Sequence, residues 1–135
     1  MKKDIAFPKV EGVKVAIVFE QNEEAEFPLW NVYLLNELSE AIEGVMISAK
    51  GYGFKEGQPQ KTAILRHSLG KILPQNHAMI EAISEEVFHL NNEYWVSYFI
   101  DNQLFDKKFI FLPESIIKQN VVYIKALGKY GILHE

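Results

Sequence analysis

Two aromatic, β-branched runs joined by a short polar turn constrain the fold of this chain more than any other feature of its sequence. The first run covers residues 94–100, the turn covers 101–103, and the second run covers 104–112, which Pro113 ends. Aromatic and β-branched residues favour strands, and Asp and Asn accept the left-handed backbone of tight turns. The pattern predicts a β-hairpin, which is stable only as part of a larger sheet.

Further short strands are expected on both sides of this hairpin, because β-branched and aromatic residues gather in runs bounded by polar or glycine-containing segments. The amphipathic helices that a parallel sheet would need between its strands are missing. No internal repeat and no long linker rich in Pro, Gly or Ser divides the chain. The expected strands are residues 13–19, 30–35, 44–49, 61–66, 121–124 and 132–133.

Two segments allow two interpretations each. Residues 76–90 have apolar side chains at helical spacing, but a strand at 78–83 followed by a single turn capped by Ser84 explains the pattern equally well. Near the C-terminus, a helix over 115–127 competes with the strand at 121–124. The strand is favoured there, because β-branched residues crowd a helix.

About seven short strands with at most one or two short helices predict a mainly β fold, either an antiparallel sandwich or a partly open barrel. An α+β fold is the alternative. The length of 135 residues argues for a single domain over 1–135. No apolar run approaches the roughly 18 residues of a membrane span.

Cysteine content and charge exclude several classes of protein. The chain has no cysteine, which excludes disulfides, thiol nucleophiles and thiolate metal sites. Its formal net charge of −4 gives no electrostatic reason to expect a nucleic-acid partner. Residues 1–9 carry the lysines of a signal peptide but lack its apolar stretch. We therefore expect a cytoplasmic protein without a membrane partner.

Neither the histidines nor the glycines form a recognisable ligand motif. None of the four histidines pairs with another at metal-ligand spacing, so no metal and no cofactor is predicted. The glycine-rich residues 50–57 match no phosphate-binding pattern and precede no helix. We interpret them as a long turn between the strands at 44–49 and 61–66.

Arg66 is the only arginine of the chain, and His67 follows it. A guanidinium binds carboxylates and phosphates through two parallel hydrogen bonds, although an ordinary surface ion pair is the more common role of such a residue. Tyr52 and Phe54 would lie across the expected turn and form one wall of a small pocket. Arg66, His67, Tyr52 and Phe54 are the predicted ligand-binding residues, and no catalytic residue is predicted.

The hairpin strands are apolar on both faces. One face can pack on the core of the domain, whereas the other needs cover from another segment, such as the C-terminal strand, or from a second subunit. Lys107 and Lys108 oppose pairing at the edge, because lysines on an edge strand block the addition of further strands. We nevertheless expect a homo-oligomer through the outer face of the 94–112 hairpin or through a sheet edge. Alternation places Trp95, Phe99, Ile110 and Leu112 on one face and Tyr94, Val96, Tyr98, Ile100, Phe105, Phe109 and Phe111 on the other.

Residues 86–98 and 105–111, together with 50–53 and 65–67, carry a resemblance to a known family. They are similar to an uncharacterised family of small bacterial single-domain proteins, some of which are labelled as phenylalanyl-tRNA synthetase subunits. The resemblance implies a translation-linked accessory protein without catalytic activity. A synthetase resembling that enzyme would need a longer catalytic domain and arginines in two motifs, whereas this chain has Arg66 alone.

The leading functional prediction is a non-enzymatic cytoplasmic binding or protein-interaction module of unknown ligand. It rests on the lack of a recognisable catalytic motif and on the two apolar faces of the hairpin. The alternative is a small-ligand-binding protein or enzyme with a site near Arg66, His67 and Tyr52. A deep pocket lined by Arg66 and His67 would favour this alternative, and a flat apolar patch would favour the interaction module.

Overall fold

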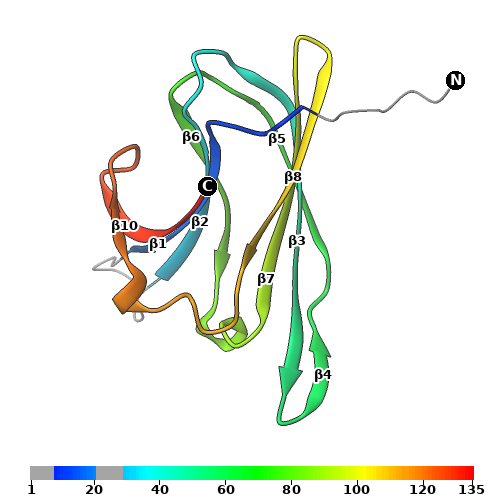
Figure 1. Cartoon of the computed structure of the whole chain (residues 1–135), viewed down its shortest axis with the longest axis vertical. Coiled ribbons are helices and arrows are strands. Elements are labelled where there is room, and N and C mark those ends of the chain that lie inside the picture. Colours follow the sequence, from blue (N-terminus) through cyan, green and yellow to red (C-terminus); the bar gives the residue numbers. More distant parts are fainter. Residues whose placement is uncertain (1–7, 21–28) are drawn as a thin grey trace, which may run out of the picture.

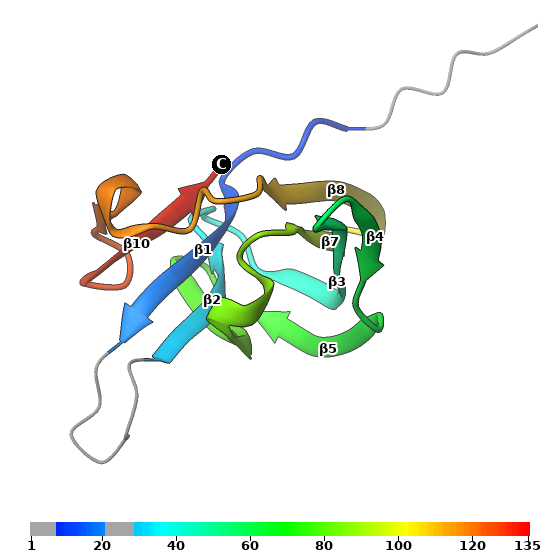
Figure 2. The same ribbon diagram turned by 90° about the horizontal axis from the view of Figure 1, so that it is seen from below.

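The computed structural model describes residues 8–20 and 29–135 and shows two antiparallel sheets packed around one core (Figure 1). Seen from below, the sheets form two layers inclined to each other (Figure 2). Two single-turn 3₁₀ helices, η1 (Glu85–Val87) and η2 (Lys118–Asn120), are the only helices of the described residues, and neither could cross a membrane. The mainly β prediction is confirmed as a sandwich, and the α+β alternative is wrong. Residues 1–7, on which part of the cytoplasmic prediction depends, lie outside the described residues.

The first sheet has the strand order β6-β2-β1-β10-β9. At its centre, a Cβ on Gly131 of β10 would lie 2.5 Å from the carbonyl oxygen of Ile17, so that only glycine allows these two strands to pair. The strands are β1 (Val13–Glu20), β2 (Leu29–Asn36), β6 (Asn76–Ile83), β9 (Val122–Ile124) and β10 (Lys129–His134).

The second sheet has the strand order β4-β3-β7-β8, and β5 also pairs with β3. The predicted hairpin is confirmed as β7 and β8, and its turn residues Asp101 and Asn102 have positive φ angles of 48° and 63°. The strands are β3 (Ile42–Lys55), β4 (Gln58–Lys61), β5 (Leu65–Ile72), β7 (Asn91–Ile100) and β8 (Gln103–Phe111).

The inward-facing side chains of both sheets form the main core. A second, smaller cluster lies on the other side of the first sheet, where Ala16, Val18 and Leu35 pack against Ile124 of the C-terminal segment. The segment around Ile124 therefore packs on one side of the first sheet, and His134 contacts the inner side of the hairpin at Phe109 and Phe111, so the described residues leave the outward side of the hairpin uncovered. The main core includes Val15, Ile17, Val32 and Leu34 from the first sheet and Ile47, Tyr94, Val96, Tyr98 and Phe109 from the second.

The region around the glycines differs from the expectation. β3 has 14 residues and pairs with two short strands in succession, so the strand expected at 61–66 is interrupted between β4 and β5. Gly51 and Gly53 lie within β3. The turn therefore consists of Glu56 and Gly57, which have positive φ angles, and not of the expected residues 50–57.

Both ambiguous segments prove to be strands with single helical turns. Residues 76–83 form β6, which pairs with β2 along its length, and the Ser84 hydroxyl then accepts a hydrogen bond from the backbone N–H of Glu86. The helix over 76–90 is wrong, because strand pairing outweighs a helical spacing of only a few residues. The segment 115–127 contains only the η2 turn and β9.

Candidate functional site

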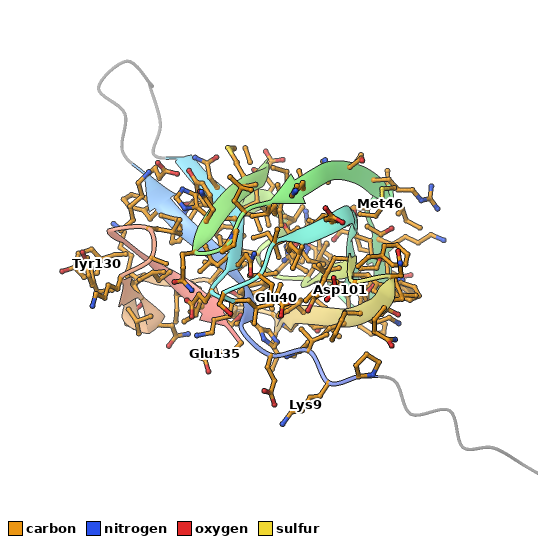
Figure 3. All side chains as sticks on the ribbon, turned by 90° about the horizontal axis from the view of Figure 1, so that it is seen from above. Lys9, Glu40, Met46, Asp101, Tyr130 and Glu135 are labelled. Carbon is orange, nitrogen blue, oxygen red and sulfur yellow. The ribbon has the colours of Figure 1, made fainter. Side chains whose placement is uncertain are left out.

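The second sheet has a surface that no described residue covers. Trp95 and Phe99 of β7 point away from the core and are each 43% exposed. Met46 of β3 and Leu104 of β8 lie beside them and are 46% and 41% exposed. Figure 3 shows Met46 on the opposite side of the molecule from Tyr130 of the first sheet. We call the surface made of Met46, Trp95, Phe99 and Leu104, with its bordering side chains, the outer face.

Gly44 makes room for the Phe99 ring on this face. β3 bulges between Ile42 and Val45, and Gly44 has a φ of 58° there. A Cβ at this position would lie 3.2 Å from Cδ2 of Phe99. The bulge therefore lets an aromatic ring lie on the sheet where a larger residue would push it away.

A shallow depression of about 220 Å³ lies in the middle of the outer face. The small side chains of Ser48 and Ser97 form its floor, because larger residues surround them on β3 and β7. Arg66 of β5 borders the depression on one side, and Asp106 of β8 borders it on the other. A cation and an anion thus stand at opposite margins of a depression that apolar and polar side chains line in similar number.

Two neighbours on β8 orient the Trp95 side chain. Its indole N–H donates a hydrogen bond to the Asp106 carboxylate. The Lys108 ammonium lies 4.6 Å from the Trp95 ring centroid, which is within the range of a cation–π interaction. The exposed indole is therefore held in one orientation, as a preorganised binding surface requires.

Arg66 makes no ion pair with any carboxylate within residues 8–20 and 29–135, whereas Lys50, Lys71 and Lys129 each pair with a glutamate. The ordinary surface ion pair that is the common role of such an arginine is thus not formed by the described part of the chain. Within the described part of the chain, no side-chain acceptor is bonded to the guanidinium.

The structure does not bring the four predicted site residues together. Arg66 faces the outer face, but the next residue, His67, points to the opposite side of β5, where its Nε2 lies 2.7 Å from Oε1 of Glu81. Tyr52 and Phe54 lie further along β3, beyond the end of β5, and Phe54 lines a separate open depression. The expected wall of a common pocket is not formed, because adjacent residues of a strand face opposite ways.

A second cavity, of about 260 Å³, lies where the edge strands of the two sheets meet. We call it the seam cavity. Tyr94 and Ala49 line it from the second sheet, and Glu81 and Ile83 line it from β6. The Tyr94 hydroxyl donates to Oε2 of Glu81 at 3.1 Å, and His67 lies on the other carboxylate oxygen. Burial and the negative charge of Glu81 raise the pKa of Tyr94 far above its usual value of 10, so this hydroxyl stays a donor.

Sequence reasoning placed Trp95 on one apolar face of the hairpin but did not identify Asp106, Glu81 or Tyr94 as site residues. Asp106 could have been placed on the same face as Trp95 by alternation along the hairpin, since Trp95 pairs with Lys108 and Ser97 pairs with Asp106. Glu81 and Tyr94 carry no comparable local signal, because their contact joins two different sheets.

Among the described residues, no group of three or more His, Asp or Glu side chains is arranged to hold a metal ion. No protein-family model, no curated protein and no solved structure matches this chain. The resemblance to the synthetase-labelled family stays a prediction, and the function has to be inferred from the residues themselves.

Proposed function

We propose that this chain is a non-enzymatic, cytoplasmic protein-interaction module that binds a second copy of itself through the outer face. The observation that supports this proposal is the grouping of Met46, Trp95, Phe99 and Leu104, all more than 40% exposed, between an arginine and an aspartate. Contiguous exposed apolar side chains of this kind characterise protein-binding surfaces.

The charges at the two margins make the outer face complementary to itself. Strands lie about 4.8 Å apart, so Arg66 and Asp106 stand roughly 14 Å apart across the four strands β5, β3, β7 and β8. A two-fold axis parallel to the strands and centred on the face carries β5 of one copy over β8 of the other. Arg66 of each copy then approaches Asp106 of its partner, and the apolar side chains meet in the middle.

The size of the face indicates a weak dimer. Four strands of about eight residues each cover roughly 19 Å by 27 Å, or about 500 Å² per copy. Stable interfaces bury about 800 Å² per partner. We therefore expect a reversible dimer whose population depends strongly on protein concentration.

Pairing through the edge of β8 is disfavoured by Lys107. This lysine points to the inner side of the edge strand, where its ammonium donates to the backbone oxygen of Glu135 at 2.7 Å and lies 4.8 Å from the Phe109 ring centroid. A strand added at this edge would have to accommodate that charge, and inward-pointing charged residues are a known protection of sheet edges. The outer face is the better candidate for association.

A charge-exchange experiment tests the proposal. Light scattering of the wild type over a concentration series should show a mass that rises from 15.6 kDa toward twice that value. Arg66→Glu alone and Asp106→Arg alone should hold the protein at the monomer mass, because each places like charges opposite one another. The double variant should recover the dimer, and Lys125→Glu, an exposed lysine on the covered side of the first sheet, should behave as the wild type.

Circular dichroism of each variant should match the wild type, because both exchanged residues are exposed. A wild-type mass that stays at the monomer value at high concentration would overturn the proposal. Dimerisation of both single variants would also overturn it, since the two charges would then play no part in the contact.

A further inference from the structure

We propose that the seam cavity binds a small primary amine, with the ammonium group on Glu81 and a compact apolar body against the walls. The cavity lies inside the sandwich edge and is separate from the outer face, so this inference does not depend on dimerisation. Glu81 is the one carboxylate among the lining residues of the cavity.

Glu81 is a preorganised anion. Tyr94 is 2% exposed, and its hydroxyl holds one carboxylate oxygen at 3.1 Å, while His67 Nε2 lies 2.7 Å from the other. A carboxylate has about four acceptor positions, so two remain when both partners are in place. A carboxylate fixed in this way needs no rearrangement to receive a cationic donor.

The seam cavity opens to solvent at the edge of the sandwich, where its lining residues Ala63, Leu65 and Ser84 are exposed. Small residues of three segments line it, which are Ala49 and Gly51 of β3, Ala63 of the β4–β5 connection and Ala82 of β6. No described side chain fills this volume of about 260 Å³, because the residues at these lining positions are small. Its size is close to the lower end of ligand pockets, which is roughly 300 Å³.

Asn92 supplies a second acceptor in the lining. It is 5% exposed, and its amide nitrogen donates to the backbone oxygens of Val87 and Leu90 at 3.0 and 3.2 Å. Its side-chain oxygen takes part in no hydrogen bond among residues 8–20 and 29–135. This oxygen is not fully buried, so it is accessible to a hydrogen-bond donor of a ligand in the cavity.

Two of the hydroxyl donors of the lining are already engaged, and Ser84 is the remaining hydroxyl, so the lining offers few side-chain donors to an anionic ligand. The Thr62 hydroxyl donates to the backbone oxygen of Ala63 at 3.0 Å, and the Tyr94 hydroxyl donates to Glu81. The Lys50 ammonium lies 3.6 Å from Glu93 and therefore toward the outer side of β3. The cavity thus presents acceptors and one negative charge to a ligand, which is the complement of an ammonium group.

Glu81 also joins β5, β6 and β7, and this structural role explains its contacts with His67 and Tyr94. This structural role does not explain the open cavity beside the carboxylate, nor why the side-chain oxygen of Asn92 accepts no hydrogen bond from the described residues. A ligand test must therefore separate binding from stability.

Calorimetric titration with benzylamine and with its neutral analogue benzyl alcohol provides this test. Wild-type protein should bind benzylamine at least about tenfold more tightly than the alcohol, because only the amine forms a charge-assisted contact. Glu81→Gln should lower the affinity for benzylamine to that for the alcohol. Glu40→Gln, at an exposed carboxylate of the β2–β3 connection, should leave both affinities unchanged.

A second variant keeps the test decisive if Glu81→Gln fails to fold. Ala63→Phe fills the cavity from an exposed connection and retains every charged group, so it should abolish amine binding while the unfolding temperature stays near that of the wild type. The proposal is overturned if wild-type protein shows no preference for the amine, or if Ala63→Phe still binds it.

Discussion

Tyr94 and Tyr98 test what a hydrogen bond contributes inside this core. They lie four residues apart on the inner face of β7 and are 2% and 1% exposed. The Tyr94 hydroxyl donates to Glu81, whereas the Tyr98 hydroxyl has no partner among the described residues. The Tyr98 ring itself is well packed, because it stacks on Phe105 with centroids 5.2 Å apart.

Removing each hydroxyl should change stability in opposite directions. A buried hydroxyl without a partner costs about 1–3 kcal/mol, so Tyr98→Phe should raise the free energy of unfolding by about 1 kcal/mol while its ring stacking is kept. Tyr94→Phe leaves Oε2 of Glu81 without its donor, while His67 stays on Oε1, and should lower the free energy of unfolding by about 1–3 kcal/mol. For a chain of 135 residues, 1 kcal/mol corresponds to about 3–4 °C in unfolding temperature.

Urea unfolding followed by tryptophan fluorescence, together with thermal unfolding followed by circular dichroism, measures both variants against the wild type. The slope of the urea transition should be unchanged. An unchanged slope shows that the variants alter stability and not the surface area exposed on unfolding. The reasoning is refuted if Tyr98→Phe is destabilised by 1 kcal/mol or more on this scale. Such a result would mean that the hydroxyl is hydrogen-bonded in the native protein.

Three further predictions concern polar side chains of the first sheet. Asn36→Ala should lower the free energy of unfolding by about 2–4 kcal/mol in a urea titration, because the buried amide bonds the backbone oxygen of Ile72 at 3.2 Å and two further carbonyls. Burial opposes ionisation of Glu20, but its hydrogen bonds, chiefly from Lys129, lower its pKa below the usual 4.5. The stability advantage of wild type over Glu20→Gln should therefore be complete above pH 4.5 and disappear as the pH falls further. Burial and Glu20 raise the pKa of Tyr33 to about 12, so wild-type stability should fall between pH 10 and 12 more steeply than that of Tyr33→Phe.

Predictions based on alternation along a strand were reliable. The hairpin, its turn and the division of its side chains into two faces follow from local chemistry, because successive residues of a strand must point to opposite sides. The segment 76–90 was different, since its few apolar residues fit helical and extended periods alike. Pairing of β6 with β2 decides between them, and that pairing brings together residues 40 or more positions apart.

The residues of the candidate sites likewise depend on strand pairing that the local sequence does not reveal. Arg66 and His67 are neighbours in sequence, yet the pleat of β5 sends one to the outer face and the other to the seam. Their partners are distant in the chain, and Asp106 and Glu81 can be found only once the strand order is known.

The sequence by itself determines that this chain forms short antiparallel strands, that its hairpin is apolar on both faces, and that it contains no thiol chemistry. These properties depend on residue type and on the two-residue period of a strand, which act locally. Only the tertiary structure decides which apolar face is covered and which carboxylate meets which hydroxyl. The C-terminal segment packs on the first sheet and leaves Trp95 and Met46 exposed, and Glu81 reaches Tyr94 only because two sheets close on each other.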